Sequence, residues 1–248
     1  MASTTETGHA INVSNLETLI AFCTAYGTTY NPSKAAIKLT ALNTLLASAK
    51  TTLTAVNTVL PPYNNAVNAR EITFAPLSKL VTRIINALAS SNVTIQVVND
   101  AKTIARKIQG KRATEKLPEI PDDPTTPEDE SQKSNSTSQL SYDNRIENFE
   151  KLIQLLAAQT GYAPNENDLK VTTLTTLLAD MRTKNTAVIT ALVPLSNARI
   201  ARNTTLYADI TGLTDVAADT KKYVKSVYGA TSPQYNQVYS IKFKKRPR

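Results

Sequence analysis

The amino-acid sequence repeats itself, and this internal duplication limits the possible folds more than any other feature. Residues 15–20, NLETLI, reappear as residues 148–153, NFEKLI. After an adjustment of one residue the matches continue in the same order: Tyr30-Asn31-Pro32 with Tyr162-Ala163-Pro164, Ile37-Lys38-Leu39 with Leu169-Lys170-Val171, 42–47 with 174–179, and Ala69-Arg70 with Ala201-Arg202. Chance does not supply this order and spacing, so the sequence predicts two copies of one module.

The ends of the two copies can be aligned after a gap. Asp100-Ala101-Lys102 then pairs with Asp219-Thr220-Lys221, and Gly110 pairs with Gly229. This alignment predicts that the last helix of the first copy corresponds to the helix that ends at Gly229.

The first copy carries clear signals for the starts and ends of helices. Ser14 or Asn15 can cap a first helix, and Asn31-Pro32 opens a long second helix because proline suits a first helical turn. Apolar residues then recur every three or four positions. Pro61-Pro62 is expected to end this helix, since proline cannot continue the hydrogen-bond ladder. A third helix and a fourth, over 92–109, follow.

The second copy repeats this scheme. A first helix is predicted over 142–159, and a second ends near Val193, so that Pro194 starts the next and a last helix ends at Gly229. Glycine is scarce, at six residues, which suits long helices. The predicted fold class is all-α, with two tandem, homologous up-and-down bundles of about four helices each.

Composition sets the expected domain boundaries. Proline, acidic residues and serine dominate the segment between the copies, which cannot bury enough apolar surface to order itself and is predicted to be a disordered linker. Its net charge is −5 over 113–141, against +7 over 1–112 and +6 over 142–248. The predicted divisions are a disordered N-terminal tail 1–13, helical repeat 1 over 14–112, linker 113–140, helical repeat 2 over 141–230, and a basic C-terminal tail 231–248.

The sequence offers little for catalysis. Cys23 is the single cysteine and lies in an apolar run, where a buried, inert thiol is expected. His9 is the single histidine, and no phosphate-binding loop or nucleophile-elbow motif occurs. We therefore expect a protein that is not an enzyme, with no cofactor, no metal and no small-molecule substrate.

A cytoplasmic protein without a membrane partner is expected. No run approaches the ~18 consecutive apolar residues of a membrane span. The N-terminus also lacks the basic and apolar regions of a secretory signal.

Three arginines are candidates for binding a polyanion. Arg70 and Arg202 occupy equivalent positions in the two copies, and Arg199 lies one helical turn before Arg202. Guanidinium groups can hold phosphate or carboxylate through paired hydrogen bonds. The alternative reading is that these side chains are exposed or form ion pairs within the protein.

The C-terminal tail is the second candidate for polyanion binding. Its basic residues, Lys242, Lys244, Lys245, Arg246 and Arg248, surround Phe243. Cations that neutralise phosphates, together with an aromatic ring that stacks on bases, suit single-stranded nucleic acid. The alternative is a tail that only keeps the protein soluble.

A tyrosine precedes the helix-opening proline in each copy. Tyr30 and Tyr162 are two residues before Pro32 and Pro164. We interpret both as structural residues that close the turn over the end of a bundle.

The second copy resembles a family of duplicated all-helical proteins of Bacteroidota to which no activity is assigned. The matching segments are 162–171 (YAPNENDLKV), 197–199, 202–203, 222–235 and 241–243. The resemblance covers about residues 148–246 closely and the first copy more loosely. The first copy lacks the Ser-Pro-Gln-Tyr segment and the Lys-Phe ending. The resemblance implies a helical fold and brings no activity, cofactor or site residue.

The function expected from these features is that of a non-enzymatic binding or scaffolding protein, with a protein as its partner. Two linked modules can raise the effective concentration at paired sites. The alternative is an accessory protein that binds nucleic acid through the basic C-terminal tail.

Overall fold

The computed structural model describes residues 8–111 and 140–245, and within these ranges the chain is helical with no strand. The prediction of an all-α fold is confirmed. The chain divides into two compact units: unit 1 comprises Met1–Asn64 and Thr190–Arg248, and unit 2 comprises Asn65–Ile189.

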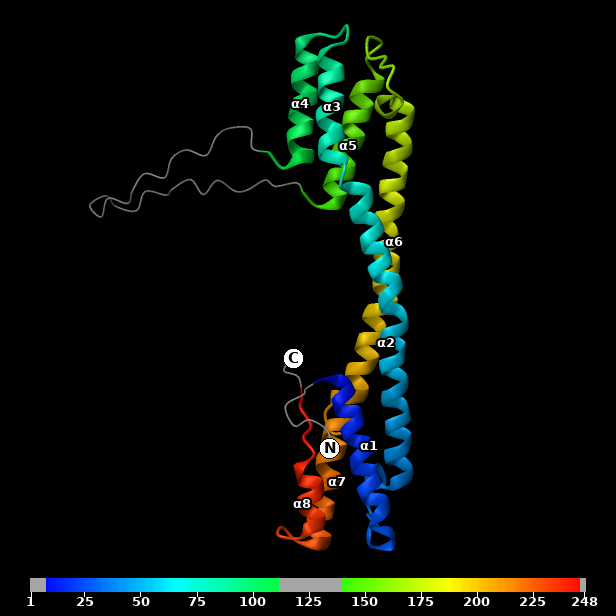
Figure 1. Ribbon diagram of the computed structural model, residues 1–248, viewed down its shortest axis with the longest axis vertical. Helices are drawn as coiled ribbons and strands as arrows, with labels where there is room; N and C mark the ends of the chain where they lie inside the picture. The colour runs from blue at the N-terminus through cyan, green and yellow to red at the C-terminus, as the bar shows by residue number, and fades with distance from the viewer. Residues whose placement is uncertain (1–7, 112–139, 246–248) are drawn as a thin grey trace, which may run out of the picture. The chain divides into compact units, whose positions relative to one another are not determined.

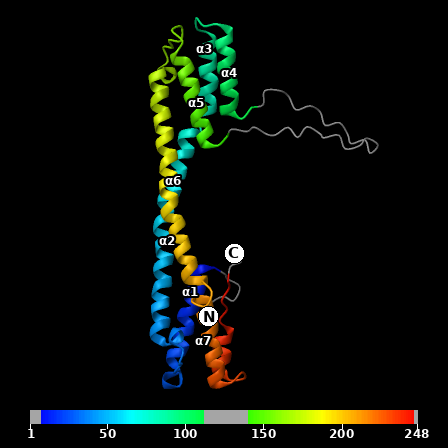
Figure 2. The same ribbon diagram turned by 180° about the vertical axis from the view of Figure 1, so that it is seen from behind.

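Each unit is a set of helices around its own core (Figures 1 and 2). Unit 1 contains α1 (His9–Ala25), the 3₁₀ turns η1 (Gly27–Thr29) and η2 (Ala35–Ile37), α7 (Leu213–Tyr228) and α8 (Pro233–Ser240). Unit 2 contains α3 (Leu77–Ala89), α4 (Ile95–Gln109), α5 (Tyr142–Ala157) and the 3₁₀ turn η3 (Asn167–Leu169). The two long helices, α2 (Leu39–Phe74) and α6 (Val171–Tyr207), contribute one part to each unit.

The compact units do not coincide with the two repeats. In unit 1, α1 of the first repeat packs against α7 and α8 of the second. In unit 2, α5 and η3 of the second repeat pack against α4 and α3 of the first. Each unit therefore combines the beginning of one repeat with the end of the other. The expected arrangement, in which 14–112 and 141–230 each form a bundle alone, differs from these contacts.

The physical reason for this difference lies in the prolines. Pro61-Pro62 was expected to end a helix and Pro194 to start one, but α2 and α6 continue through them. All three proline side chains are exposed. The residues four positions earlier, whose carbonyl groups lose a helical partner, are also exposed, so water can satisfy those groups. Without a turn at the prolines, neither repeat folds back on itself.

A regular apolar stripe explains why the two long helices persist. On α2 it comprises Leu42, Leu46, Ala49, Leu53, Val56, Leu60, Tyr63, Val67, Arg70 and Phe74, at alternating spacings of four and three. On α6 the same positions are Leu174, Leu178, Met181, Asn185, Val188, Leu192, Leu195, Arg199, Arg202 and Leu206. This average spacing of about 3.5 residues is that of helices that pack lengthwise on a partner helix. Buried members of the stripe lie on both sides of the prolines, Val56 and Phe74 on α2 and Val188 and Leu195 on α6.

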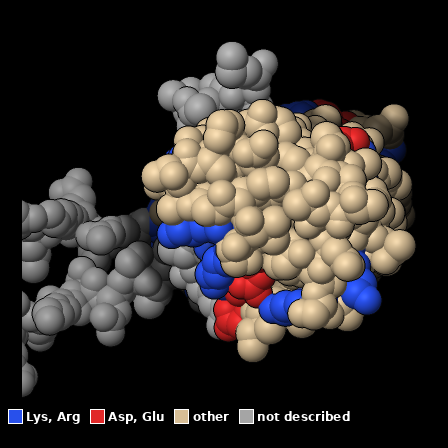
Figure 3. Space-filling model, turned by 90° about the horizontal axis from the view of Figure 1, so that it is seen from below, with Lys and Arg blue, Asp and Glu red and all other residues tan. Residues whose placement is uncertain are grey.

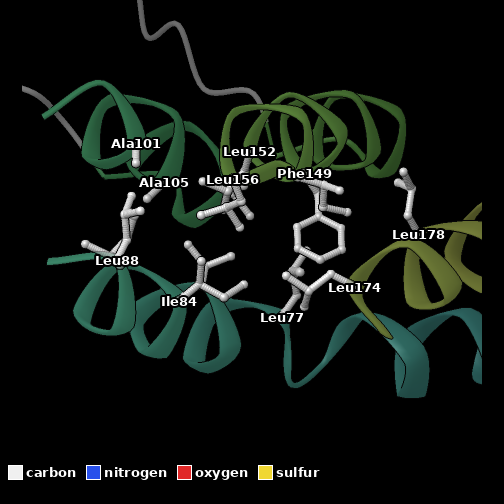
Figure 4. Packing of buried hydrophobic residues seen from close by; sticks show 14 of the residues in the cluster. Leu77, Ile84, Leu88, Ala101, Ala105, Phe149, Leu152, Leu156, Leu174 and Leu178 are labelled. Carbon is white, nitrogen blue, oxygen red and sulfur yellow. The ribbon is translucent and has the colours of Figure 1, made fainter. Parts of the chain in front are cut away.

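The core of unit 2 is drawn from both repeats (Figure 4). Leu77, Ile84 and Leu88 of α3 face side chains of α5 and α6, and Ala101 and Ala105 of α4 close the cluster. The partners from the second repeat are Phe149, Leu152, Leu156, Leu174 and Leu178. Small alanines on α4 allow that helix to approach closely. Unit 1 has an equivalent cluster, in which Leu16, Leu19 and Cys23 of α1 pack with Leu213 and Val224 of α7.

The same contacts recur in the two units. The buried Tyr30 donates its hydroxyl to the carbonyl oxygen of Ile37 at 2.6 Å, and Tyr162 does the same to Leu169 at 2.9 Å. The prediction that these tyrosines close a turn is confirmed. An ion pair is also repeated: Glu17 with Lys50 at 2.7 Å, and Glu150 with Arg182 at 2.6 Å.

The alignment of the ends of the copies is wrong. The element that follows the long helix is α3 in the first repeat and α7 in the second, so α4 corresponds to α8 and not to the helix ending at Gly229. The fully buried residues agree with this order: Leu77, Val81 and Leu88 of α3 correspond to Leu213, Ala217 and Val224 of α7. The loop between α6 and α7, residues 208–212, is three residues longer than the loop between α2 and α3, residues 75–76, and this difference shifts the matches between the ends of the copies.

The helical part of the chain extends further toward both ends than predicted. Helix α1 begins at His9, and residues 233–240 of the predicted C-terminal tail form α8. Nearly all of the predicted linker 113–140 lies outside the described residues, as do residues 1–7.

One helical stretch of the described residues, 39–89, is long and apolar enough to cross a membrane. Its most apolar window has a mean hydropathy of 1.2, and 33% of that window is buried within the protein. This is weak support for a membrane span, because a helix that packs in a soluble protein has the same composition. A cytoplasmic location stays a prediction.

Replacing either turn tyrosine by phenylalanine tests the repeated hydrogen bond. Tyr30→Phe and Tyr162→Phe each leave a buried carbonyl oxygen without its donor, so each should lower the free energy of unfolding by about 1–2 kcal/mol. Urea unfolding measures both. Tyr63→Phe, a half-buried tyrosine on α2, serves as the control and should change stability much less. A loss at only one of the two positions would contradict their structural equivalence.

Candidate functional site

Arg70 is held within unit 2. Its guanidinium lies 3.8 Å from the centre of the Tyr142 ring, and Nη1 donates to Oδ1 of Asn185 at 3.0 Å. Asn185 in turn donates to Asp143 at 2.7 Å. Because this half-buried side chain is already used for packing and hydrogen bonding, Arg70 is a structural residue in unit 2.

The other two candidate arginines belong to unit 1. Nε and Nη2 of Arg202 both donate to Oδ1 of the neighbouring Asn203, at 3.1 and 2.9 Å. Arg199 is exposed on the same helix. Arg70 is therefore not in the same unit as Arg199 and Arg202.

Arg145 was not singled out from the sequence. Its guanidinium lies 5.4 Å from the centre of the Phe74 ring, and Nη2 donates to the carbonyl oxygen of Phe74 at 3.3 Å. Burial lowers the pKa of Arg145. Within the described part of the chain, the Nε atoms of Arg145 and Arg70 are buried and have no hydrogen-bond partner. Sequence could not indicate this, because position 145 is Asn12 in the first repeat and only packing decides its environment.

Residues Ile241–Lys245, hereafter the strap, lie against unit 1. The side-chain amide of Asn12 pairs with the backbone of Lys244, donating to its carbonyl oxygen at 2.9 Å and accepting from its N–H at 3.1 Å. Asn15 donates to the carbonyl oxygen of Lys242 at 2.7 Å. Ile241 is buried, and Phe243 packs against the core of unit 1. The strap is thus part of the fold.

The basic side chains of the strap have different surroundings. Lys245 forms ion pairs with Asp209 at 3.1 Å and with Asp215 at 3.0 Å. The side chains of Lys242 and Lys244 are exposed, and the Lys242 ammonium lies 4.3 Å from the centre of the Tyr239 ring. Arg246 and Arg248 lie outside the described residues. Part of the positive charge predicted to face a polyanion is therefore neutralised within unit 1.

Lys221 of α7 contacts the strap. Its ammonium donates to the carbonyl oxygen of Ile241 and lies 5.0 Å from the centre of the Phe243 ring. Burial, with a smaller contribution from the nearby charge of Lys242, lowers the pKa of Lys221 to about 8.

A second surface of unit 1 is rich in tyrosine and poor in charge. It lies where the turn after α1 and the turn between α7 and α8 come together, and Figure 3 shows that most of this end carries neither acidic nor basic side chains. Residues 24–33 and 226–241 contain no charged residue. We call this surface the tyrosine end and define it by Tyr26, Val227, Tyr228, Tyr235 and Tyr239.

Contacts among its rings fix the shape of the tyrosine end. The Tyr26 and Tyr228 rings lie 5.2 Å apart, and the Tyr26 hydroxyl donates to the carbonyl oxygen of Gln234 at 2.9 Å. On α8, the Tyr235 and Tyr239 rings lie 5.6 Å apart. Tyr239 is 56% exposed and Val227 38%, so apolar surface is available to a partner.

Unit 2 has no counterpart of the tyrosine end. The residues of α3 and α4 that correspond to Tyr228, Tyr235 and Tyr239 include no tyrosine, since Tyr142 and Tyr162 are the tyrosines of that unit. The two copies have therefore diverged at this surface. Sequence inspection missed it because the tyrosines come from three helices and are brought together only by folding.

Unit 2 has a shallow groove between α5 and α6. Asp143, Glu147 and Glu150 line one side, and Arg182 and Thr186 line the other. The ion pairs of Glu150 with Arg182 and of Glu147 with Lys151 occupy most of this charge. Among the described residues no cluster of His, Cys, Asp and Glu has a geometry that could hold a metal ion.

Cys23 is buried in unit 1, and burial raises its pKa to about 11. Its thiol therefore carries little thiolate at neutral pH, the opposite of what a nucleophile needs. The interpretation of Cys23 as a buried thiol is confirmed.

The pKa of Lys221 generates a prediction about stability. The unfolded chain has an ordinary lysine pKa of ~10.4, so between about pH 8 and that value it binds more protons than the folded protein. The folded state should therefore gain stability from this group as the pH rises through that range. Chemical denaturation at pH 7.5 and 9.5 should show this gain in the wild type and a smaller one in Lys221→Met. Lys102→Met, at an exposed position of α4, should match the wild type; equal gains in all three proteins would contradict the burial of Lys221.

Comparison with known protein families, curated proteins and solved structures found no match to this chain. The resemblance to the Bacteroidota family thus stays a prediction.

Proposed function

We propose that this protein is a non-enzymatic binding protein that holds a protein partner through the tyrosine end of unit 1. The observation that carries the proposal is a tyrosine-rich surface built from two segments without charged residues, 24–33 and 226–241, on a chain of net charge +8. Centres of protein interfaces are depleted in charged residues and enriched in aromatic ones. Tyrosine combines a large apolar face with a polar group, so it binds a partner without needing a deep pocket.

The ring contacts support a preformed binding surface. Tyr26 and Tyr228 are held by each other and by the bond from Tyr26 to Gln234. Side chains that are already ordered lose little conformational entropy when a partner binds. The exposed threonines, asparagines and glutamines around the rings offer hydrogen bonds at the rim.

A protein partner fits this surface better than a polyanion does. Affinity for nucleic acid comes largely from cations that neutralise phosphates. The nearest cations of the tyrosine end, Lys225 and Lys242, lie over the rings of Tyr235 and Tyr239, at 5.6 and 4.3 Å. Lys245 of the strap is paired with two aspartates. The tyrosine end thus presents mainly aromatic rings, and of these three lysines Lys245 is neutralised by its aspartates.

The test places charge on the tyrosine end. Val227→Glu with Thr231→Glu alters exposed positions near the α7–α8 turn. The matched control, Thr172→Glu with Thr176→Glu, adds the same charge to exposed positions of α6 in unit 2. Tagged proteins are used to capture partners from a nuclease-treated lysate of the source cells, and the captured protein is then purified and titrated by calorimetry.

We expect one defined protein whose affinity falls at least tenfold with the first variant and is unchanged with the control. Equal binding by both variants would remove the tyrosine end from the function. Recovery of nucleic acid, or of proteins that vanish after nuclease treatment, would favour the nucleic-acid alternative. In that case, binding should weaken steeply with salt, and replacing Lys244, Lys245 and Arg246 by alanine should reduce this dependence.

A further inference from the structure

The two repeats carry opposite charges at the same structural position. Arg83 of α3 and Asp219 of α7 correspond, because both lie six residues after the leucine that begins each helix. Lys34, which precedes η2, corresponds to Glu166, which precedes η3, since the tyrosines and prolines before them align. The charge of each partner position is thus reversed between the copies.

In unit 2 the observed pair joins α3 to η3. Arg83 donates through Nη1 and Nη2 to the two carboxylate oxygens of Asp168, and the charge of Glu166 also acts on the guanidinium. The hydrogen bond from Arg83 lowers the pKa of Asp168. This contact links the first repeat to the second.

In unit 1 the pair has the opposite polarity. The ammonium of Lys34 lies 2.5 Å from Oδ2 of Asp219, and Lys222 lies 3.1 Å from Oδ1. Asp219 belongs to α7, so this contact also joins one repeat to the other. Both units therefore place a cation against an anion only because the repeats have exchanged partners.

A repeat that folded on itself would lose both attractions. Arg83 would then lie opposite Ala36, the equivalent of Asp168, and near Lys34, the equivalent of Glu166. Asp219 would face Glu166 and Asp168. Like charges at such positions repel. The exchanged arrangement is favoured, and the self-paired arrangement is disfavoured, by the same four positions.

A steric contact acts in the same direction. A Cβ atom built on Gly161 would lie 2.3 Å from the carbonyl oxygen of Asn92, so this close approach requires glycine. The corresponding residue of the first copy, directly before the turn tyrosine, is Thr29. If the first repeat folded on itself, the Thr29 side chain would collide with Asn92. The first repeat is thus a poor partner for its own short helices.

We propose that the beginning of each repeat is a binding surface specific for the short helices of the other repeat, and that the reversed charges of Lys34 and Glu166 and of Arg83 and Asp219, together with Asp168, make it reject its own. The partner that fits is the complementary half of this protein. Exposed ion pairs contribute little singly, but here attraction in one arrangement is replaced by repulsion in the other at two places.

The experiment cuts the folded, full-length protein. A protease site is inserted after residue 125, and the cut protein is diluted and analysed by native mass spectrometry and size exclusion. Wild-type halves should stay together as a 1:1 complex, because each compact unit contains both. Separation of the wild-type halves into independently folded monomers would overturn the exchange.

Two double variants change the amino-acid composition in the same way and differ only in where the charges are placed, so a comparison of the two measures the effect of charge placement. Arg83→Asp with Asp219→Arg makes both exchanged contacts repulsive and both self-contacts attractive. Arg83→Asp with Asp168→Arg restores an attractive exchanged contact in unit 2 and leaves Lys34–Asp219 intact. We expect the dissociation constant of the cut halves to rise at least tenfold in the first variant and to stay within about threefold of wild type in the second.

Equal dissociation constants for the two variants would overturn the proposed role of the charges. If the first variant does not fold, Lys34→Glu with Asp168→Lys reverses the same contacts from the opposite side. The difference between variants should also shrink in 1 M salt, where exposed charges are screened. A difference that persists unchanged in high salt would show that packing, not charge, selects the partner.

Discussion

The rest of the fold depends on the continuity of α2 and α6 through Pro61-Pro62 and Pro194. Because neither helix ends at its prolines, each long helix contributes one part to unit 1 and one part to unit 2. Once neither repeat can turn back at its prolines, the beginning of each copy must find its short helices in the other. The exchange of partners follows from helix continuity.

The two units share several contacts and differ in their surfaces. The turn tyrosines Tyr30 and Tyr162 and the ion pairs of Glu17 and Glu150 persist in both, because they maintain the helix packing. The tyrosine end and the strap belong to unit 1. The contacts that hold the turns are thus shared by the two units, whereas the tyrosine end and the strap distinguish unit 1.

The basic C-terminus illustrates how context changes the meaning of a charged segment. As a linear motif, residues 241–248 suit nucleic acid. In the structure, Ile241 and Phe243 pack inward, the amides of Asn12 and Asn15 hold the backbone, and Lys245 meets two aspartates. The strap is therefore an extended segment with two faces. Ile241 and Phe243 cover the core of unit 1, and the side chains of Lys242 and Lys244 face the solvent.

The sequence by itself determined the helical class, the turn role of Tyr30 and Tyr162 and the buried state of Cys23. These are local properties, set by residue spacing, by proline and by an apolar run. Only the tertiary structure decided that the prolines lie within helices, that α3 corresponds to α7, and that the tyrosines of three helices meet. The alternating spacing of four and three along α2 and α6 is present in the sequence, but polar residues such as Arg70 and Arg202 interrupt the apolar pattern. Which copy a helix packs against depends on the summed energy of many contacts between distant residues, and no local pattern encodes that sum.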